Sequence, residues 1–308
     1  SSIRVLDDIG IRYARDYISR FGFDSERLSN DMTLVLGSTA MSPMEIATGY
    51  AVFANGGYKV EPYFIDRIED SNGNIVYQAN PAIVCRGCPE APNVFAPADS
   101  SQSTAIDIQP LALNVDEGQA SAPSVAIPVK RFAPQVMSPQ TAFLIDSMLK
   151  DVVLLGTARA AKRALPRDDL AGKTGTTNDA VDAWFTGYNG DYVASTWVGY
   201  DSNTSLGYNE FGGKAALPGW VEFMTAALAN RPTNNLPQPV GIVQVRIDPK
   251  TGLLATPKTQ DARFEFFKAD NVPKTFTSTT LNIDFSVKQQ APMPVLDGQA
   301  DDSPEILF

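Results

Sequence analysis

Residues 173–177 read Lys-Thr-Gly-Thr-Thr and combine an ammonium group, hydroxyls and a glycine in one short segment. The charge of Lys173 and the hydroxyls of Thr174 and Thr176 are suited to binding a carboxylate. Gly175 has no side chain, so that a substrate backbone can lie against this segment as an added β-strand. These residue types therefore permit a carboxylate and an extended backbone to bind here.

The chain contains no histidine, and this absence limits the chemistry further. It excludes Ser-His-Asp and Cys-His relays within these residues, and every metal site that depends on histidine. A hydrolase or acyltransferase built from this chain must take its general base from lysine, a carboxylate or tyrosine.

Size and charge describe an acidic globular protein. The 308 residues are 44% hydrophobic, enough for a large core, and carry a net charge of −10. That charge argues against nucleic acid or an anionic membrane as a partner. No apolar run reaches the roughly 20 residues that cross a bilayer. The chain starts without Met, at Ser1-Ser2-Ile3, so we expect it to come from a larger protein with any membrane anchor upstream.

Apolar periodicity and capping residues predict the elements that position residues 173–177. Ser42-Pro43-Met44-Glu45 is a capping box that opens a helix, and Ser138-Pro139 opens another. The predicted helices are 1–23, 43–54, 139–155 and 218–230, and the predicted strands are 58–68, 75–77, 170–177, 182–188, 191–199 and 240–247. The three strands from 170 to 199 form an antiparallel meander in this prediction.

Composition divides the chain into four segments. Residues 1–80 and 137–255 carry the regular elements, and residues 81–136 are rich in Pro, Ser, Gln and Ala with little periodicity. We expect one domain formed by 1–80 and 137–255, interrupted at 81–136 by a Pro-rich insertion or a small accessory region. Residues 256–308 are expected to be a largely extended carboxy-terminal extension.

Several segments together resemble the transpeptidase domain of class A penicillin-binding proteins, the 1A type in particular. They are Leu36-Gly37-Ser38, Ser42 to Glu45 with Tyr50 to Gly57, Gly172 to Asn178 with Asp182 to Tyr188, and Val243 to Leu253. The Lys-Thr-Gly triad belongs to the motif set of β-lactamases and penicillin-binding proteins. The resemblance implies an α/β fold with a central antiparallel sheet and helices on both faces.

The resemblance also implies an activity that needs no cofactor or metal. In such proteins the D-Ala-D-Ala end of a peptidoglycan stem peptide acylates a serine, the acyl group passes to an amine of a neighbouring stem, and β-lactams trap the acyl-enzyme. The implied location is the periplasmic face of the bacterial inner membrane, and the implied parent protein also contains a glycosyltransferase. The remaining, amino-terminal part of that protein would be a partner of this chain.

The same resemblance assigns roles to the residues of the triad. Lys173 and Thr176 are catalytic, the backbone N–H of Thr176 being one of two oxyanion-hole donors, and residues 174–177 bind substrate. The competing interpretation is an ordinary strand with β-branched residues and an exposed lysine. Trp184 is expected to be core or cleft wall and not a direct substrate contact.

The nucleophile is expected to lie outside this chain. The S-x-x-K sequence at 147–150 falls within the predicted helix 139–155, whose apolar stripe comprises Leu144, Ile145, Met148, Leu149, Val152 and Leu155. This pattern places Ser147 and Lys150 toward the solvated face, where Lys150 makes an ordinary i,i+4 ion pair with Asp146. We therefore interpret Ser147 as a decoy. No S-x-N occurs, and the chain alone is predicted to form no acyl-enzyme.

Cys85 and Cys88 are the two cysteines, and they form a C-x-x-C within the expected insertion. They cannot complete a four-ligand zinc site from Cys and His, and no thioredoxin-like βαβ pattern surrounds them. A small-loop disulfide or two free thiols remain as interpretations.

Three functions remain open from the sequence. The first is the acyltransferase part of a bifunctional peptidoglycan synthase. The second is a β-lactamase or DD-carboxypeptidase, which the 1A-like segments and the large insertion disfavour. The third is a non-catalytic penicillin-fold module that binds peptidoglycan or protein partners.

Overall fold

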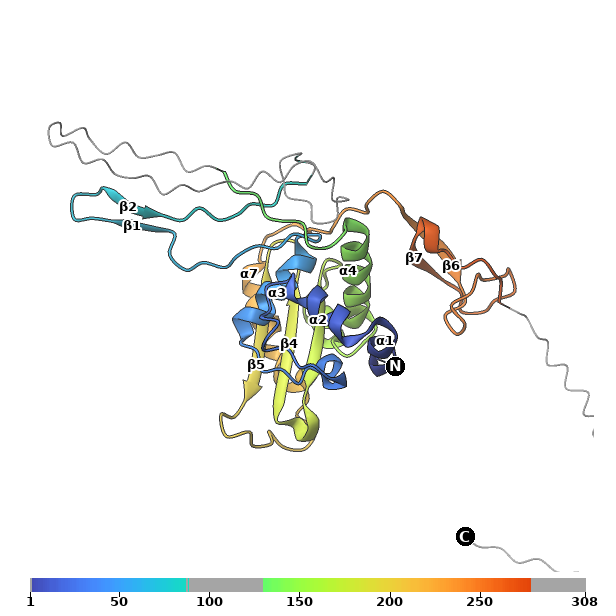
Figure 1. Cartoon of the computed structure of the whole chain (residues 1–308). Coiled ribbons are helices and arrows are strands. Elements are labelled where there is room, and N and C mark those ends of the chain that lie inside the picture. Colours follow the sequence, from blue (N-terminus) through green and yellow to red (C-terminus); the bar gives the residue numbers. More distant parts are fainter. Residues whose placement is uncertain (1, 87, 89–129, 278–308) are drawn as a thin grey trace, which may run out of the picture. The chain divides into compact units, whose positions relative to one another are not determined.

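The computed structural model describes residues 2–86, 88 and 130–277 (Figure 1). The chain divides into two compact units, one formed by residues 1–245 and 265–272 and the other by 246–264 and 273–308. Residues 89–129 and 278–308, which include most of the predicted insertion and much of the predicted extension, lie outside the described residues.

A three-stranded antiparallel sheet forms the centre of the first unit. Its strands are β3 (Ala171–Thr176), β4 (Asp182–Tyr188) and β5 (Val193–Gly199), and β4 lies between the other two. The register pairs Ala171 with Tyr188 and Thr176 with Ala183. The predicted meander is therefore confirmed, and residues 173–176 lie on β3, at one edge of this sheet.

Helices pack on both faces of the sheet, as expected. Alternate residues of a strand point to opposite faces. On one face, Tyr188 packs with Ala54 of α3 (Pro43–Ala54) and with Leu149 of α4 (Pro139–Leu154). On the other face, Phe185 packs against Trp220 of α7 (Leu217–Ala227), with the two ring centroids 4.9 Å apart. The sheet is thus the middle layer of a helix-sheet-helix sandwich.

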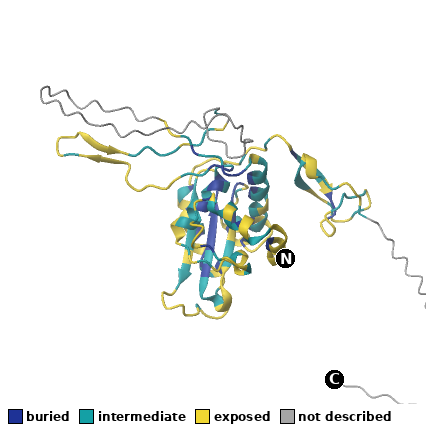
Figure 2. Ribbon diagram, in the orientation of Figure 1, coloured by how far each residue is buried: buried dark blue, intermediate teal, exposed yellow. Residues whose placement is uncertain are grey.

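Strand β4 runs through the most buried part of the protein (Figure 2). Phe185 and Trp220 are fully buried, and the indole N–H of Trp220 donates to the carbonyl of Gly187 over 3.2 Å. The indole therefore buries a large apolar surface without leaving its one donor unpaired, which stabilises the contact between α7 and the sheet. This packing fixes β4, and β4 in turn fixes β3.

The remaining elements complete the two units. They are α1 (Ser2–Ile9), α2 (Ile11–Ser19), η1 (Met32–Leu36), β1 (Arg67–Glu69), β2 (Ile75–Gln78), α5 (Arg159–Ala164), η2 (Asn178–Ala180), α6 (Gly212–Ala215), β6 (Ile242–Ile247), β7 (Arg263–Lys268) and η3 (Ala269–Asn271). Strands β1 and β2 form a hairpin, and β6 pairs with β7. Within the described residues, no helix is both long and apolar enough to span a membrane.

Three predictions about these elements need correction. The single helix over 1–23 is wrong, because Gly10 adopts φ 84° and separates α1 from α2. The strand over 58–68 is reduced to Arg67–Glu69, next to a turn in which the Asp70 carboxylate accepts backbone N–H groups of Asn72 and Asn74. Strand β7 was not predicted, since residues 256–308 were expected to be an extension.

The capping box is confirmed at the start of α3, and the Ser138 cap at the start of α4. The predicted solvated face of α4 is wrong, however. Asp146 is only 3% exposed, whereas Met148, placed on the apolar stripe, is 60% exposed. The helix turns Ala142, Asp146 and Val153 inward, so that a charged residue occupies a core position.

Candidate active site

Strand β3 presents an unpaired edge within the described part of the chain. The backbone N–H of Thr177 donates to the carbonyl of Asp182 over 3.1 Å, which makes these two residues a hydrogen-bonded pair. In an antiparallel ladder, such pairs alternate with pairs whose N–H and C=O groups point away from the partner strand. The backbone groups of Thr174 and Thr176 therefore point to the free edge of β3.

Lys173 lies exposed beside this edge. Its Nζ donates to the carbonyl oxygen of Thr174 over 2.8 Å and to Thr174 Oγ1 over 3.3 Å. The ammonium group and a hydroxyl thus meet next to free backbone donors. This combination of groups can bind an anion with directed hydrogen bonds.

Thr157, which follows α4, extends this arrangement. Its Oγ1 lies 2.9 Å from Thr174 Oγ1, so the two hydroxyls are hydrogen-bonded. Sequence reasoning missed this residue because it lies in a connection between helices. Only the packing of α4 along β3 brings it to the edge strand.

The Thr176 side chain contacts α6. The backbone N–H of Gly212 donates to Thr176 Oγ1 over 3.0 Å. A Cβ atom at Gly212 would lie 2.3 Å from the carbonyl oxygen of Trp184 and 2.4 Å from that of Gly175. Only glycine allows α6 to approach the sheet this closely, and the approach supports β3 at Thr176.

Thr177 and Trp184 occupy the end of the β3–β4 hairpin. The Thr177 hydroxyl accepts the backbone N–H of Asp182 over 2.8 Å, so it closes the connection between the strands. Trp184 is half-buried, with its ring 6.2 Å from that of Trp197. Trp197 in turn donates its indole N–H to Asp182 Oδ1 over 2.8 Å. The substrate-binding role of Thr177 stays a prediction.

Lys150 is held by partners other than Ser147, and the interpretation of Ser147 as a decoy stays a prediction. Lys150 Nζ lies 2.8 Å from Asp146 Oδ2 and donates to Asn235 Oδ1 over 2.7 Å. Both contacts engage the Lys150 ammonium with residues other than Ser147. Ser147 itself is half-buried in the middle of α4.

The half-buried Tyr50 and the buried Tyr188 both have raised pKa values. Burial raises the pKa of Tyr50 to about 12. Burial and, second, the nearby charge of Asp146 raise the pKa of Tyr188 well above its usual value. Both phenols therefore stay protonated at neutral pH. In the part of the chain that the structure describes, no three Cys, Asp or Glu side chains are arranged to hold a metal ion.

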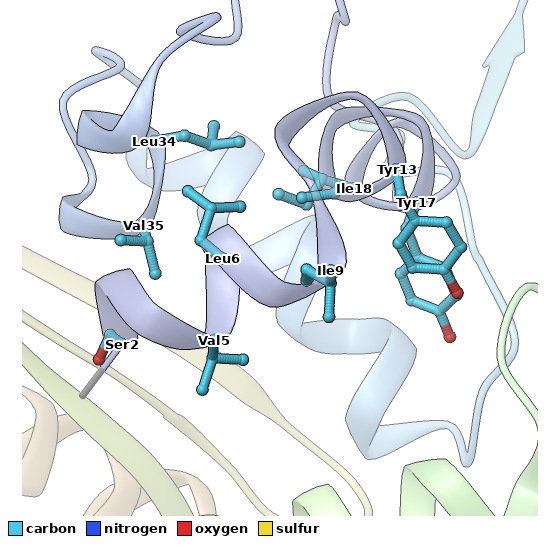
Figure 3. Close-up of a pocket in the computed structure, with 10 residues that line it drawn as sticks. Ser2, Val5, Leu6, Ile9, Tyr13, Tyr17, Ile18, Leu34 and Val35 are labelled. Carbon is cyan, nitrogen blue, oxygen red and sulfur yellow. The ribbon is translucent and has the colours of Figure 1, made fainter.

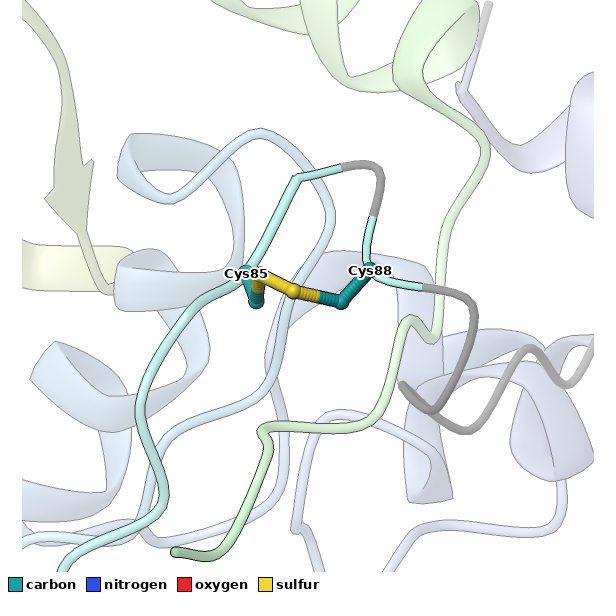
Figure 4. The surroundings of a disulfide bond; sticks show 2 residues. All are labelled: Cys85 and Cys88. Carbon is teal, nitrogen blue, oxygen red and sulfur yellow. A yellow bond between two sulfur atoms is a disulfide. The ribbon is translucent and has the colours of Figure 1, made fainter.

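Cys85 and Cys88 are joined in a disulfide with their Cα atoms 5.6 Å apart (Figure 4). Between them, the Arg86 guanidinium donates to the carbonyl of Asn55 over 3.2 Å. Asn55 is the residue that ends α3, so that a cation lies where the helix dipole is negative. The disulfide closes the loop that holds this arginine.

A groove of about 390 Å³ lies along α1, α2 and η1 (Figure 3). Its lining is apolar, with Val5, Leu6, Ile9, Leu34 and Val35 among the contributing side chains. Apart from the phenols of Tyr13 and Tyr17, it offers no titratable group. The candidate active site is therefore the edge of β3 and not this groove.

Comparison with known proteins identifies the family. Residues 2–208 match the family described as the penicillin binding protein transpeptidase domain, and residues 238–279 match the penicillin-binding protein 1A C-terminal domain. Penicillin-binding protein 1A of Pseudomonas aeruginosa is 46% identical over 277 residues, 88% of this chain and 33% of that protein. The Escherichia coli protein of the same name is 35% identical over 298 residues, 86% of this chain and 34% of that protein.

A solved structure agrees with this assignment. The crystal structure of penicillin-binding protein 1A from Haemophilus influenzae superposes with a TM-score of 0.74 at 33% sequence identity, and the match covers 90% of this chain and 39% of that one. The chain spans about a third of the length of the curated relatives it matches. It belongs to the penicillin-binding protein transpeptidase family, and within it to the 1A type.

Proposed function

We propose that this chain provides the carboxylate-binding and oxyanion-stabilising wall of a peptidoglycan DD-transpeptidase, and that it works as part of a longer polypeptide. One observation carries the proposal. The backbone groups of Thr174 and Thr176 point to the free edge of β3, and the Lys173 ammonium lies beside that edge. Membership of the transpeptidase family supports the same reaction.

The geometry suggests how a stem peptide binds. Its backbone pairs with the edge of β3 as an added strand, and its terminal carboxylate meets Lys173 and the Thr174 hydroxyl. The N–H of Thr176 then donates to the oxygen on which negative charge develops during acyl transfer. Loss of one such donor costs about 2.7–4 kcal/mol of transition-state stabilisation.

The nucleophile in this proposal is a serine outside these 308 residues. Its oxygen forms an ester with the penultimate D-Ala carbonyl as terminal D-Ala leaves, and an acceptor amine then displaces the serine to form the cross-link. The engaged Lys150 supports the exclusion of Ser147 from this role. We place the parent protein at the periplasmic face of the inner membrane, and we expect it also to contain a glycosyltransferase.

Labelled penicillin and intact-protein mass spectrometry test the proposal. A protein that joins these residues to a segment with S-x-x-K and S-x-N should gain one covalent penicillin. The Lys173→Met variant should react at least tenfold more slowly, while Lys258→Met, an exposed lysine of the other unit, should react like the wild type. An adduct on the 308-residue chain alone would contradict the proposal that the nucleophile lies elsewhere. Equal reaction rates of the two lysine variants would contradict the role of β3.

A further inference from the structure

We infer that Thr157 is a positioning residue that sets the carboxylate-binding hydroxyl of Thr174. The inference rests on the proposed function and assigns to it a residue outside the Lys-Thr-Gly strand. Its basis is the 2.9 Å contact between the two hydroxyl oxygens, together with the 3.3 Å bond from Lys173 Nζ to Thr174 Oγ1.

The role of Thr157 follows from the number of hydrogen bonds that the Thr174 hydroxyl can form. A threonine hydroxyl has one proton to donate and two lone pairs to accept with. Thr174 Oγ1 already accepts from Lys173, and when Thr157 donates to it as well, both lone pairs are filled. The one remaining capacity of Thr174 is its own proton, which is then directed to an incoming carboxylate. Two donors on one oxygen also polarise that proton and strengthen the bond it makes.

The backbone around Thr157 is held firmly enough for this task. The next residue, Ala158, is completely buried in the core, and its N–H donates to the Val152 carbonyl over 3.1 Å. On the other side, the N–H of Gly156 donates to the Asp151 carbonyl over 3.0 Å. Thr157 itself is exposed, so its side chain faces the edge of β3 from a rigid base and not from a mobile loop.

The arrangement predicts discrimination between ligands. A ligand that ends in a carboxylate uses the proton of Thr174, whereas the methyl ester of the same ligand has no charge at that position. Removing the Thr157 hydroxyl should therefore weaken only the first reaction. A neutral hydrogen bond contributes modestly, which corresponds to a change of about three- to tenfold in rate.

The test compares acylation by a penicillin and by its methyl ester in the protein that also carries the nucleophile motifs. The Thr157→Val variant should slow the carboxylate ligand about three- to tenfold and leave the ester rate unchanged, and Thr157→Ser should restore the wild-type ratio. The matched control is Thr225→Val on α7, since this exposed threonine also uses its hydroxyl in a hydrogen bond, to the Val221 carbonyl.

Two outcomes would overturn the inference alone: unchanged rates in Thr157→Val, or equal slowing for both ligands. A wild-type protein that reacts with neither ligand would overturn the proposed function and this inference with it. Melting temperatures of the variants should match that of the wild type, because Thr157 is exposed. A double variant with Thr174→Val should lose no more than Thr174→Val alone, as expected when one residue acts through the other.

Discussion

Lys150 and Asp146 form an ion pair one helical turn apart on α4, with Nζ 2.8 Å from Oδ2. Solvent reaches only 18% of the lysine side chain and 5% of the aspartate side chain. The lysine also donates to Asn235, so the pair links α4 to the segment that follows α7. A charge pair at this depth is sensitive to the loss of one partner, because the other charge is left without compensation.

Replacing Asp146 with alanine should therefore destabilise the protein by about 3–5 kcal/mol. The measurement is urea unfolding at neutral pH, monitored by tryptophan fluorescence. Glu210 and Lys214 provide the control, since they form an i,i+4 pair on a more exposed surface. The Glu210→Ala variant should change stability by no more than about 1 kcal/mol. Similar losses in the two variants would show that Asp146–Lys150 behaves as a surface pair.

Asp169 lies just before the start of β3 and is the centre of a network of hydrogen bonds. Arg167 donates to both of its carboxylate oxygens, over 2.9 and 2.7 Å, and the backbone N–H of Asn234 and the side chain of Asn189 also donate to it. Burial alone would raise the pKa of Asp169. The bonds from Arg167, Asn234 and Asn189 outweigh burial and hold that pKa below its usual value.

This shift predicts a pH dependence of stability. A carboxylate whose pKa is lower in the folded state stabilises the fold above its unfolded pKa of about 3.9, and this stabilisation is lost as the pH falls through the folded value. The stability difference between wild type and Asp169→Asn should thus be largest near neutral pH and shrink below about pH 4. Asp168→Asn, which changes the exposed neighbour, should show a much smaller difference. Urea titrations from pH 3 to 7 measure both, and a constant difference for Asp169→Asn would refute the argument.

Local signals in the sequence were sufficient for the sheet and for most helix ends. Strands β3, β4 and β5 follow one another with short connections, one of them the Asn189-Gly190 turn, and the caps at Ser42 and Ser138 require only neighbouring residues. The division of the first helix at Gly10 was missed because the apolar spacing continues across it. The inward face of α4 was missed because a buried ion pair places a charged residue where hydrophobic periodicity expects an apolar one.

The candidate site could be located from the sequence for the same reason. Residues 173–177 are contiguous, so they could be recognised as one motif, and their roles follow from the family resemblance and stay predictions. The contacts of Thr157 with Thr174 and of Gly212 with Thr176 join residues far apart in the sequence. Such contacts depend on how α4 and α6 pack on the sheet, and a single sequence carries no local signal for them.

Gly212 offers a direct test of that packing. Because a Cβ atom there would overlap the carbonyl oxygens of Trp184 and Gly175, Gly212→Ala should push α6 away from β3 and cost about 1–3 kcal/mol of stability. Gly219→Ala is the matched control, because it adds the same methyl group at an exposed position of α7, where the nearest atom is a Thr196 methyl at 3.4 Å. That change should be neutral or stabilising by up to about 1 kcal/mol. Thermal unfolding of both variants measures the two effects. A Gly212→Ala protein as stable as the wild type would contradict the close approach of α6 to β3.

Variants of Thr176 should distinguish the role of its side-chain hydroxyl from the role of its backbone N–H. Its N–H points to the free edge of β3, where we propose that it stabilises the oxyanion, and its hydroxyl accepts the N–H of Gly212. Thr176→Ser keeps both groups and should acylate with penicillin at nearly the wild-type rate. Thr176→Val keeps the backbone donor but leaves the Gly212 N–H without its acceptor, at a cost of about 1–3 kcal/mol.

The main effect of Thr176→Val should therefore be a loss of stability. The acylation rate should fall only to the extent that the loss of the hydrogen bond to Gly212 displaces β3. Stopped-flow acylation and thermal unfolding of the same samples distinguish the two effects. If the hydroxyl itself were the catalytic group, Thr176→Val would lose about a hundredfold in acylation rate, as expected for removal of an oxyanion donor, with little change in melting temperature. The hydrogen bond to α6 predicts the opposite: a clear fall in melting temperature and a smaller fall in rate.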